Sequence, residues 1–242
     1  MKILITNDDG IGNVGIKLLA AWAKKLGEVT VVAPKVEQSA KSHAIDFTRP
    51  IEVKKVDLLE GVRAYSMDST PADCVRFAIL GLKEKFDLVL SGINKGVNLG
   101  GDIVYSGTVG AVFEAARLGA KGIAFSSFPD DQVGASKHFD EVYDYIANNG
   151  MFEENGIFNV NIPKEVKGIR MTYQGSVYFS DAFELTEGSE EIYVQVGAPV
   201  PDEYPDDLDR DTVAILEGYI TVTPLMATRT NMETFHKFKK LN

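Results

Sequence analysis

Two adjacent carboxylates, Asp8 and Asp9, follow the first strand-like run of the sequence, in the stretch NDDGIGNVG. At about 4 Å, two like charges repel by on the order of 1 kcal/mol in water, and by about 4 kcal/mol at an effective dielectric constant of 20. A hard divalent cation such as Mg²⁺ or Mn²⁺ would relieve this repulsion, because such ions prefer carboxylate, amide and hydroxyl oxygens. The pair therefore predicts a metal site at the end of the first strand.

Two other interpretations of this loop stay open on its residues alone. Gly10, Gly12 and Gly15 spell the G-x-G-x-x-G turn of dinucleotide-binding proteins, which presents backbone N–H groups to a pyrophosphate. The two carboxylates before the glycines oppose that ligand, and the second strand ends in VVAPK without the acid that would bind a ribose. The remaining interpretation is that Asn7 and Asp8 only cap the helix that follows and stabilise the turn.

A long polar loop, SGINKGVNLGGDIVYSG, follows a later strand and leads into a helix at Ser106, Gly107 and Thr108. Small residues at the start of a helix leave backbone N–H groups open, so this segment predicts an anion site that needs no net positive charge. The alternative is that Ser106 is a simple N-cap. Asn94, in the same loop, carries an amide oxygen suited to a metal ion, and the alternative there is an Asx turn.

A third loop, VEQSAKSHAI, offers the Ser39 hydroxyl and the His43 imidazole. We interpret His43 as a structural hydrogen-bonding residue, because a nucleophilic serine would also need a base and an oxyanion hole. The sequence has no G-x-S-x-G elbow, Walker A loop, CxxC or HExxH motif. Cys74 is its one cysteine, which excludes an intrachain disulfide, and we expect it on a buried helix face.

Composition limits the partners of the 242-residue chain. Its 35 acidic and 25 basic residues give a formal net charge of -10, which disfavours a nucleic-acid polymer as the ligand. The apolar runs are of strand length and too short to span a bilayer. The start MKILIT lacks the long apolar stretch of a signal peptide. We therefore expect a cytoplasmic protein without a membrane segment.

The elements that position these loops alternate along the first half of the chain. Apolar strands separated by amphipathic helices predict an α/β fold with a parallel, doubly wound sheet. In such sheets ligands bind beyond the carboxyl ends of the strands, which is where the polar loops lie. Strands are predicted at residues 2–6, 28–34, 86–92 and 122–127, two short extra strands at 44–56 and 62–67, and helices at 15–26, 70–82, 106–119 and 136–148.

The sequence pattern changes near residue 158, where strand-like segments separated by Gly and Ser residues begin. We divide the single functional domain into a catalytic core, residues 1–160, and a β-rich extension, residues 161–242. The extension is expected to carry a hairpin and C-terminal oligomerisation elements.

Several motifs follow one another in a familiar order: ILITNDDGI, VVAP with EQS, TPADCV, DLVLSGINKGVNLGGDIVYSGTVGA, NVNIP and EGYITVTPL. With them the sequence resembles the SurE (survival protein E) family of metal-dependent nucleotidases and acid phosphatases, over essentially the whole chain. The resemblance implies a Rossmann-like core with a β-hairpin extension, paired as a homodimer or homotetramer. It also implies hydrolysis of nucleoside monophosphates at the 5′ position, and in some relatives at the 3′ position or on short polyphosphate.

The resemblance further implies roles for particular residues. Beyond the resemblance, our own mechanistic hypothesis is that Asp8 or Asp9 orients or deprotonates the attacking water. The chain departs from the family pattern at Lys35, Lys41 and Ser69, and we expect these residues to alter substrate preference. The implied ligands of one divalent ion per subunit, Mg²⁺ or Mn²⁺, are Asp8, Asp9, Ser39 and Asn94, and the implied phosphate-binding residues are Asn98, Ser106, Gly107 and Thr108.

Two other classes of function stay open on the sequence. One is a nicotinamide-dependent oxidoreductase that uses GIGNVG, which NAD binding unaffected by Asp8→Asn would favour. The other is a non-catalytic sensor of nucleotide or phosphate, which would bind its ligand without releasing phosphate.

Overall fold

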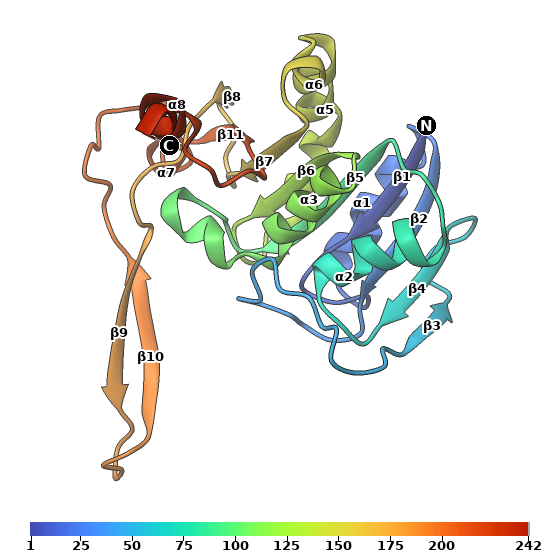
Figure 1. Cartoon of the computed structure of the whole chain (residues 1–242), viewed down its shortest axis with the longest axis horizontal. Coiled ribbons are helices and arrows are strands. Elements are labelled where there is room, and N and C mark those ends of the chain that lie inside the picture. The colour runs from blue at the N-terminus through green and yellow to red at the C-terminus, as the bar shows by residue number, and fades with distance from the viewer. Residues whose placement is uncertain (242) are drawn as a thin grey trace.

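The computed structural model describes residues 1–241, in which nine strands form one sheet in the order β3-β4-β2-β1-β5-β6-β7-β11-β8. Strands β4, β2, β1, β5, β6 and β7 run parallel, while β3 pairs antiparallel with β4 and β11 antiparallel with β7. Helices cover both faces of the sheet (Figure 1). The predicted α/β, doubly wound, Rossmann-like fold is confirmed.

The strands of the described residues are β1 (Lys2–Thr6), β2 (Glu28–Pro34), β3 (Val53–Val56), β4 (Arg63–Met67), β5 (Leu88–Lys95), β6 (Lys121–Ser127), β7 (Ile157–Ile162), β8 (Gly168–Met171), β9 (Phe179–Leu185), β10 (Tyr193–Pro199) and β11 (Tyr219–Leu225). The helices are α1 (Val14–Ala23), α2 (Pro71–Arg76), the π-helix η1 (Phe77–Gly81), the 3-10 helix η2 (Gly100–Tyr105), α3 (Gly107–Arg117), α4 (Gln132–Ala135), the 3-10 helix η3 (Ser136–His138), α5 (Phe139–Asn148), α6 (Met151–Glu154), α7 (Asp211–Ala214), α8 (Met232–Phe238) and the 3-10 helix η4 (Lys239–Leu241).

The central strands are apolar on both faces because both faces are covered. Helices α1 and α5 pack on one face, where Trp22 lies 5.2 Å from the ring of Phe139. Helices α2 and α3 pack on the other face, where Cys74 and Ala111 are fully buried. The buried helix position predicted for Cys74 is therefore confirmed.

Two elements differ from the sequence prediction. Thr70 is the N-cap of α2, as predicted. The α-helix ends at Arg76, and the chain continues as the π-helix η1, which the apolar periodicity of the sequence does not indicate. Of the predicted strand at 44–56, the last four residues form β3. The preceding segment is held by side chains instead, since Arg49 pairs with Asp46 and Asp68.

The predicted hairpin is formed by β9 and β10, and Figure 1 shows it projecting from the body of the molecule. The sheet itself does not break at residue 160, because β7 crosses that position and β11 and β8 extend the same sheet. The division into a catalytic core and an extension stays a prediction.

The order of the strands places a switch point beside β1. The chain passes from β1 to β2 on one side, and later returns to β5 on the other side of β1. Connections that leave in opposite directions open a crevice at the carboxyl ends of these strands. The loops after β1 and β5 meet there.

Candidate active site

A cavity of about 400 Å³ lies at this switch point. It brings together five of the predicted site residues, which are Asp8, Ser39, Asn94, Asn98 and Ser106. A second cavity of about 650 Å³ lies at the opposite, amino ends of the strands, where Met1, Asp87 and Lys121 line it. None of the predicted site residues lines this second cavity.

Asp8 is bound to the start of α3. Its carboxylate accepts a hydrogen bond of 2.5 Å from the Thr108 hydroxyl and one of 3.1 Å from the Thr108 backbone N–H. Asp8 is 4% exposed and Thr108 is fully buried, so these bonds form in a dry environment. Burial raises the pKa of Asp8 above its ordinary value, although the bonds from Thr108 oppose that effect.

Asp9 is bound to the end of β5. Its Oδ2 accepts a hydrogen bond of 3.1 Å from the Lys95 backbone N–H. Burial, with a smaller effect from the charge of Asp8, raises the pKa of Asp9 to about 6. Both carboxylates therefore lie where ionisation is disfavoured unless a positive charge is bound beside them.

The loop after β2 reaches Asp8 through its backbone. The Gln38 N–H donates to the Asp8 carbonyl oxygen at 2.7 Å, which places Ser39 at the cavity. The Ser39 hydroxyl donates to Glu37 Oε1 at 2.7 Å, and its oxygen retains lone pairs for another partner. Glu37 also adds a negative charge near Asp8 and Asp9, a contribution that the sequence did not indicate.

The oxygens around the cavity suit a hard divalent cation. The Asn94 amide nitrogen donates to the Gly96 carbonyl oxygen at 2.7 Å, which leaves its amide oxygen as the remaining polar group. Among residues 1–241, no three His, Cys, Asp or Glu side chains are grouped to hold a metal ion. A metal here would therefore depend on amide and hydroxyl oxygens besides the Asp8 and Asp9 carboxylates, a donor set typical of Mg²⁺ and Mn²⁺ sites.

Asn98 is held from β7. Its carbonyl oxygen accepts from the Asn159 amide at 2.8 Å and from the Asn161 amide at 2.9 Å, and its N–H donates to Asn161 Oδ1 at 2.7 Å. Its own amide nitrogen donates to the Ser126 hydroxyl at 2.8 Å. Asn159 and Asn161 were not among the predicted site residues, although two amides in a fully buried strand were the signal that could have indicated them.

Ser106 caps α3, since its hydroxyl accepts from the Val109 N–H at 3.1 Å. The next residue, Gly107, lies against Asp8, and a Cβ atom at Gly107 would be 3.1 Å from the Asp8 Cβ. The absence of a side chain thus allows the helix start to approach the carboxylate. As the first residue of the helix, Gly107 has a backbone N–H without an intrahelical partner.

Of the glycines after Asp9, Gly15 allows close packing of helix and sheet. A Cβ at Gly15 would be 2.6 Å from the Ile93 carbonyl oxygen, so α1 crosses β5 closely at that point. The N-cap of α1 is Asn13, whose side chain accepts from the Gly15 N–H. Asn7 and Asp8 therefore do not cap this helix, and Asp8 is hydrogen-bonded to the start of α3 instead. Asn7 does stabilise the turn, since its amide nitrogen donates to the Gly10 carbonyl oxygen at 3.0 Å.

His43 hydrogen-bonds to Glu114 through its Nε2 atom at 2.8 Å. Glu114 is 2% exposed and also pairs with Arg76 and Arg117. Burial opposes ionisation of Glu114, but the bonds from Arg76, His43 and Arg117 lower its pKa below the ordinary value. His43 thus ties its loop to α3, in agreement with the structural interpretation.

Further residues reach the cavity without having been predicted. Lys95 follows Asn94 directly, and Asp102 and Tyr105 belong to η2. The root of the β9–β10 hairpin contributes Tyr178, Phe179, Asp181, Gln195, Val196 and Gly197. No local pattern links these hairpin residues to Asp8, because they lie about 170 to 190 positions away in the chain.

The fold and the site together define a doubly wound α/β protein with an oxygen-lined cavity at the switch point of its sheet. The chain belongs to the SurE family, since the family model described as Survival protein SurE matches residues 3–181. No helix within residues 1–241 is long and apolar enough to cross a membrane.

The curated relatives of this chain carry the name 5′-nucleotidase SurE. One from Thermoanaerobacter sp. (strain X514) is 39% identical, with 93% of this chain and 92% of the relative covered. One from Thermosipho melanesiensis is 38% identical, with 99% and 97% covered. The crystal structure of the SurE protein from Aquifex aeolicus is similar with a TM-score of 0.82 and 35% identity, covering 100% of this chain and 99% of that one.

Proposed function

We propose that this protein is a divalent-metal-dependent nucleotidase that hydrolyses nucleoside 5′-monophosphates to nucleoside and phosphate. The relatives named 5′-nucleotidase support this substrate class. The observation that carries the proposal is the cavity in which Asp8, Ser39 and Asn94 adjoin the start of α3. Oxygen ligands for a cation and a helix N-terminus for an anion meet there, as hydrolysis of a phosphomonoester requires.

Asp8, Asp9, Ser39 and Asn94 would hold one Mg²⁺ or Mn²⁺ ion per subunit. When bound, such an ion neutralises phosphate oxygens and activates water. The local cation also explains how a chain with a formal net charge of -10 would bind an anion.

The protein's own groups bind and orient the substrate. The Gly107 N–H and the dipole of α3 favour a phosphate oxygen at the helix start. Lys95 lines the same cavity and supplies a positive charge to a second oxygen. Asn159 and Asn161 hold the backbone of Asn98, and the Ser126 hydroxyl accepts from its amide nitrogen, so the Asn98 side chain is held in place at the cavity where the phosphate would bind.

The two carboxylates have different roles in this proposal. Both oxygens of Asp8 accept hydrogen bonds from Thr108, so Asp8 is held as a metal ligand. Of the Asp9 oxygens, Oδ2 accepts from the Lys95 N–H. The other oxygen, Oδ1, is the group we assign to orient the attacking water and accept its proton.

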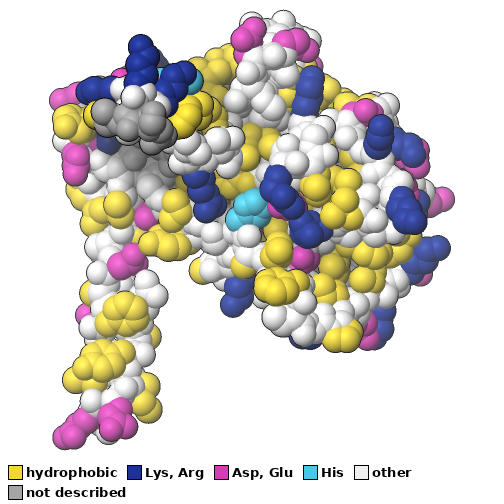
Figure 2. Space-filling model, viewed as in Figure 1, with side chains coloured by type: hydrophobic (Ala, Val, Ile, Leu, Met, Phe, Trp, Pro, Cys, Tyr) yellow, Lys and Arg dark blue, Asp and Glu magenta, His cyan; other side chains and the backbone are white. Residues whose placement is uncertain are grey.

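The β9–β10 hairpin supports self-association as a homodimer or homotetramer. Phe183 is 68% exposed and Tyr193 is 57% exposed, and Figure 2 shows hydrophobic side chains along the projecting arm. An isolated two-stranded hairpin is only marginally stable in water, so an arm of this kind gains stability from a partner. We propose a second copy of this chain as that partner.

Phosphate release from a panel of nucleotides tests the activity. The panel contains 5′- and 3′-monophosphates and short polyphosphate, each with Mg²⁺, Mn²⁺ or a chelator. We expect wild-type activity with a divalent ion, and losses of about 100-fold or more in Asp8→Asn and Asp9→Asn. Full activity in chelator, or unchanged activity in both variants, would contradict the metal-dependent mechanism.

A further inference from the structure

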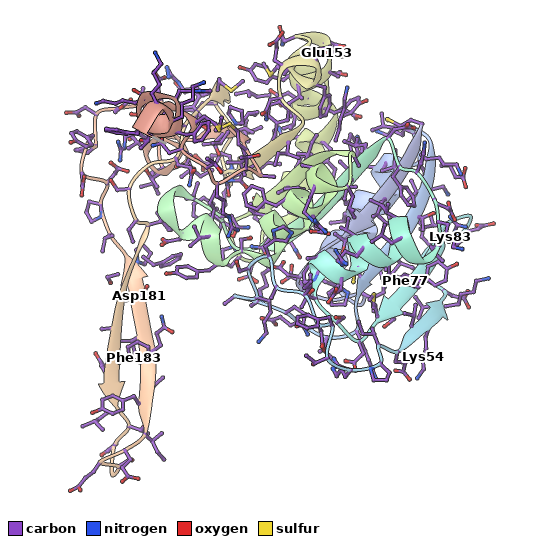
Figure 3. All side chains as sticks on the ribbon, viewed as in Figure 1. Lys54, Phe77, Lys83, Glu153, Asp181 and Phe183 are labelled. Carbon is purple, nitrogen blue, oxygen red and sulfur yellow. The ribbon has the colours of Figure 1, made fainter. Side chains whose placement is uncertain are left out.

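The cavity continues from the phosphate end to the root of the β9–β10 hairpin. Asp8 and Ser106 line one part of it, and Phe179, Asp181 and Gln195 line another. Figure 3 shows Asp181 on the half of the hairpin nearest the body of the molecule. A nucleotide whose phosphate lies at Ser106 therefore has its base directed toward this root.

The hairpin root is fastened to the segment that leads into α3. The Asp102 carboxylate accepts from the backbone N–H groups of Tyr178 and Phe179, at 2.8 and 2.9 Å. The Asp211 carboxylate accepts from the Gly100 and Gly175 N–H groups, at 3.1 and 2.7 Å. These bonds fix the root relative to the start of α3, so the spacing between the two ends of the cavity is set by the fold.

Asp181 and Gln195 form a hydrogen-bonded pair on this root. Asp181 lies opposite Gly197 in the hairpin, so Gln195, two residues away, projects from the same face. The Gln195 amide nitrogen donates to Asp181 Oδ1 at 3.3 Å. An ionised carboxylate only accepts hydrogen bonds, so the amide group must present its nitrogen to Asp181.

The bonded pair presents a fixed sequence of hydrogen-bonding groups. The second N–H of the Gln195 amide is a donor, and Asp181 Oδ1 and Oδ2 follow as two acceptors. Guanine presents the complement along one edge, with O6 as an acceptor and N1–H and the N2 amino group as donors. Adenine and cytosine present a donor where the pair also has a donor, and uracil and hypoxanthine lack the second adjacent donor.

We propose that the root of the hairpin is a nucleobase subsite selective for guanine, with Asp181 and Gln195 as its specificity-determining residues. This inference rests on the proposed function and names a preferred substrate, guanosine monophosphate. Two exposed rings line the same cavity as the pair, Tyr105 at 58% and Phe179 at 39%. Proteins read unpaired bases in this way, by stacking on aromatic rings and by hydrogen bonds to the base edge.

Binding without turnover tests this subsite. Dissociation constants of guanosine and inosine are measured by calorimetry with Mn²⁺ present, since these nucleosides carry no phosphate to hydrolyse and differ only in the N2 amino group. We expect wild-type protein to bind the guanosine ligand about 10-fold more tightly, as for one hydrogen bond to a charged group. Asp181→Asn offers one acceptor in place of two, so the guanosine ligand should fall to the affinity of the inosine ligand. Glu184→Gln, the same chemical change further along β9, should leave the ratio unchanged.

Equal affinities in the wild type, no measurable guanosine binding, or a ratio unaltered by Asp181→Asn would each overturn the assignment. Hydrolysis of 4-nitrophenyl phosphate with Mn²⁺ tests the proposed function separately, because this ester has no base. If the protein hydrolyses that ester but binds the guanosine and inosine ligands with equal affinity, the guanine subsite alone is contradicted. Selective guanosine binding without turnover of any ester would contradict the hydrolytic activity alone.

Discussion

Asp8 and Thr108 are joined by two hydrogen bonds across 100 positions of the chain, one from the threonine hydroxyl and one from its backbone N–H. The pair links the end of β1 to the start of α3. The carboxylate predicted as a metal ligand and the helix start predicted as an anion site are therefore one unit. Thr108 acts on the site through Asp8, because its side chain is fully buried and its donors already point at the carboxylate.

Thr108→Val removes the hydroxyl donor while retaining the shape of the side chain. We expect Mn²⁺ affinity and kcat/KM to fall by about 10- to 100-fold, as for other partners that orient a metal ligand. Calorimetric Mn²⁺ titration and nucleotide hydrolysis measure the two effects. Thr108→Ser retains the donor and should restore most of both quantities, and unchanged Mn²⁺ affinity in Thr108→Val would show that the hydroxyl does not orient Asp8.

Lys95→Met removes the positive charge that lines the cavity while the backbone bond to Asp9 remains. We expect kcat/KM for a nucleoside monophosphate to fall by about 10-fold or more, because a hydrogen bond to a charged phosphate oxygen is lost. Steady-state kinetics measure the change. Lys17→Met, on the exposed face of α1, alters the net charge equally and serves as the control. Equal effects of the two substitutions would point to net charge rather than to a contact.

Asp202→Asn should destabilise the protein in a pH-dependent way. Burial opposes ionisation of Asp202, but bonds from Thr212 and Ser176 and the ion pair with Arg210 at 2.8 Å hold its pKa below the ordinary value. Its contribution to stability is therefore present above about pH 4 and is lost as the pH falls through the lower pKa of the folded state. We expect a loss of about 3 kcal/mol at pH 7.

The measurement for Asp202 is thermal or denaturant unfolding of both proteins between pH 7 and pH 3. The difference between wild type and Asp202→Asn should shrink across this range. Asp206→Asn, at an exposed position of the same loop, should show little effect at any pH. A difference that stays constant with pH would assign the effect to packing instead of charge.

Phe183→Ser tests the role of the hairpin in self-association. Phe183 lies on β9 away from the body of the molecule (Figure 3) and outside the cavity lining. We expect light scattering after size exclusion to report a smaller assembly than for the wild type. Glu184→Gln, the neighbouring exposed residue, should retain the wild-type mass. Wild-type mass in Phe183→Ser would place the contact elsewhere on the chain.

The amino-acid sequence by itself determined the class of the fold and the position of the polar loops. Runs such as KILIT and EVTVVAP are mostly apolar, because parallel strands are buried on both faces, and this property is visible in a single segment. Thr70 and Pro71 likewise marked the start of α2, since capping is a matter of adjacent residues. The π-helix that follows was missed, because its wider turn leaves no distinct mark in the apolar pattern.

Only the tertiary structure decided which polar groups meet. Three contacts each join segments at least 60 positions apart. They are the pairing of Asp8 with Thr108, the support of Asn98 by Asn159 and Asn161, and the approach of the hairpin root to the cavity. Such contacts follow from the order of strands and the path of the connections, and local residue preferences carry no information about them. The residue types of the loops therefore predicted their chemistry, while the assembly of the loops into one site depended on the switch point beside β1.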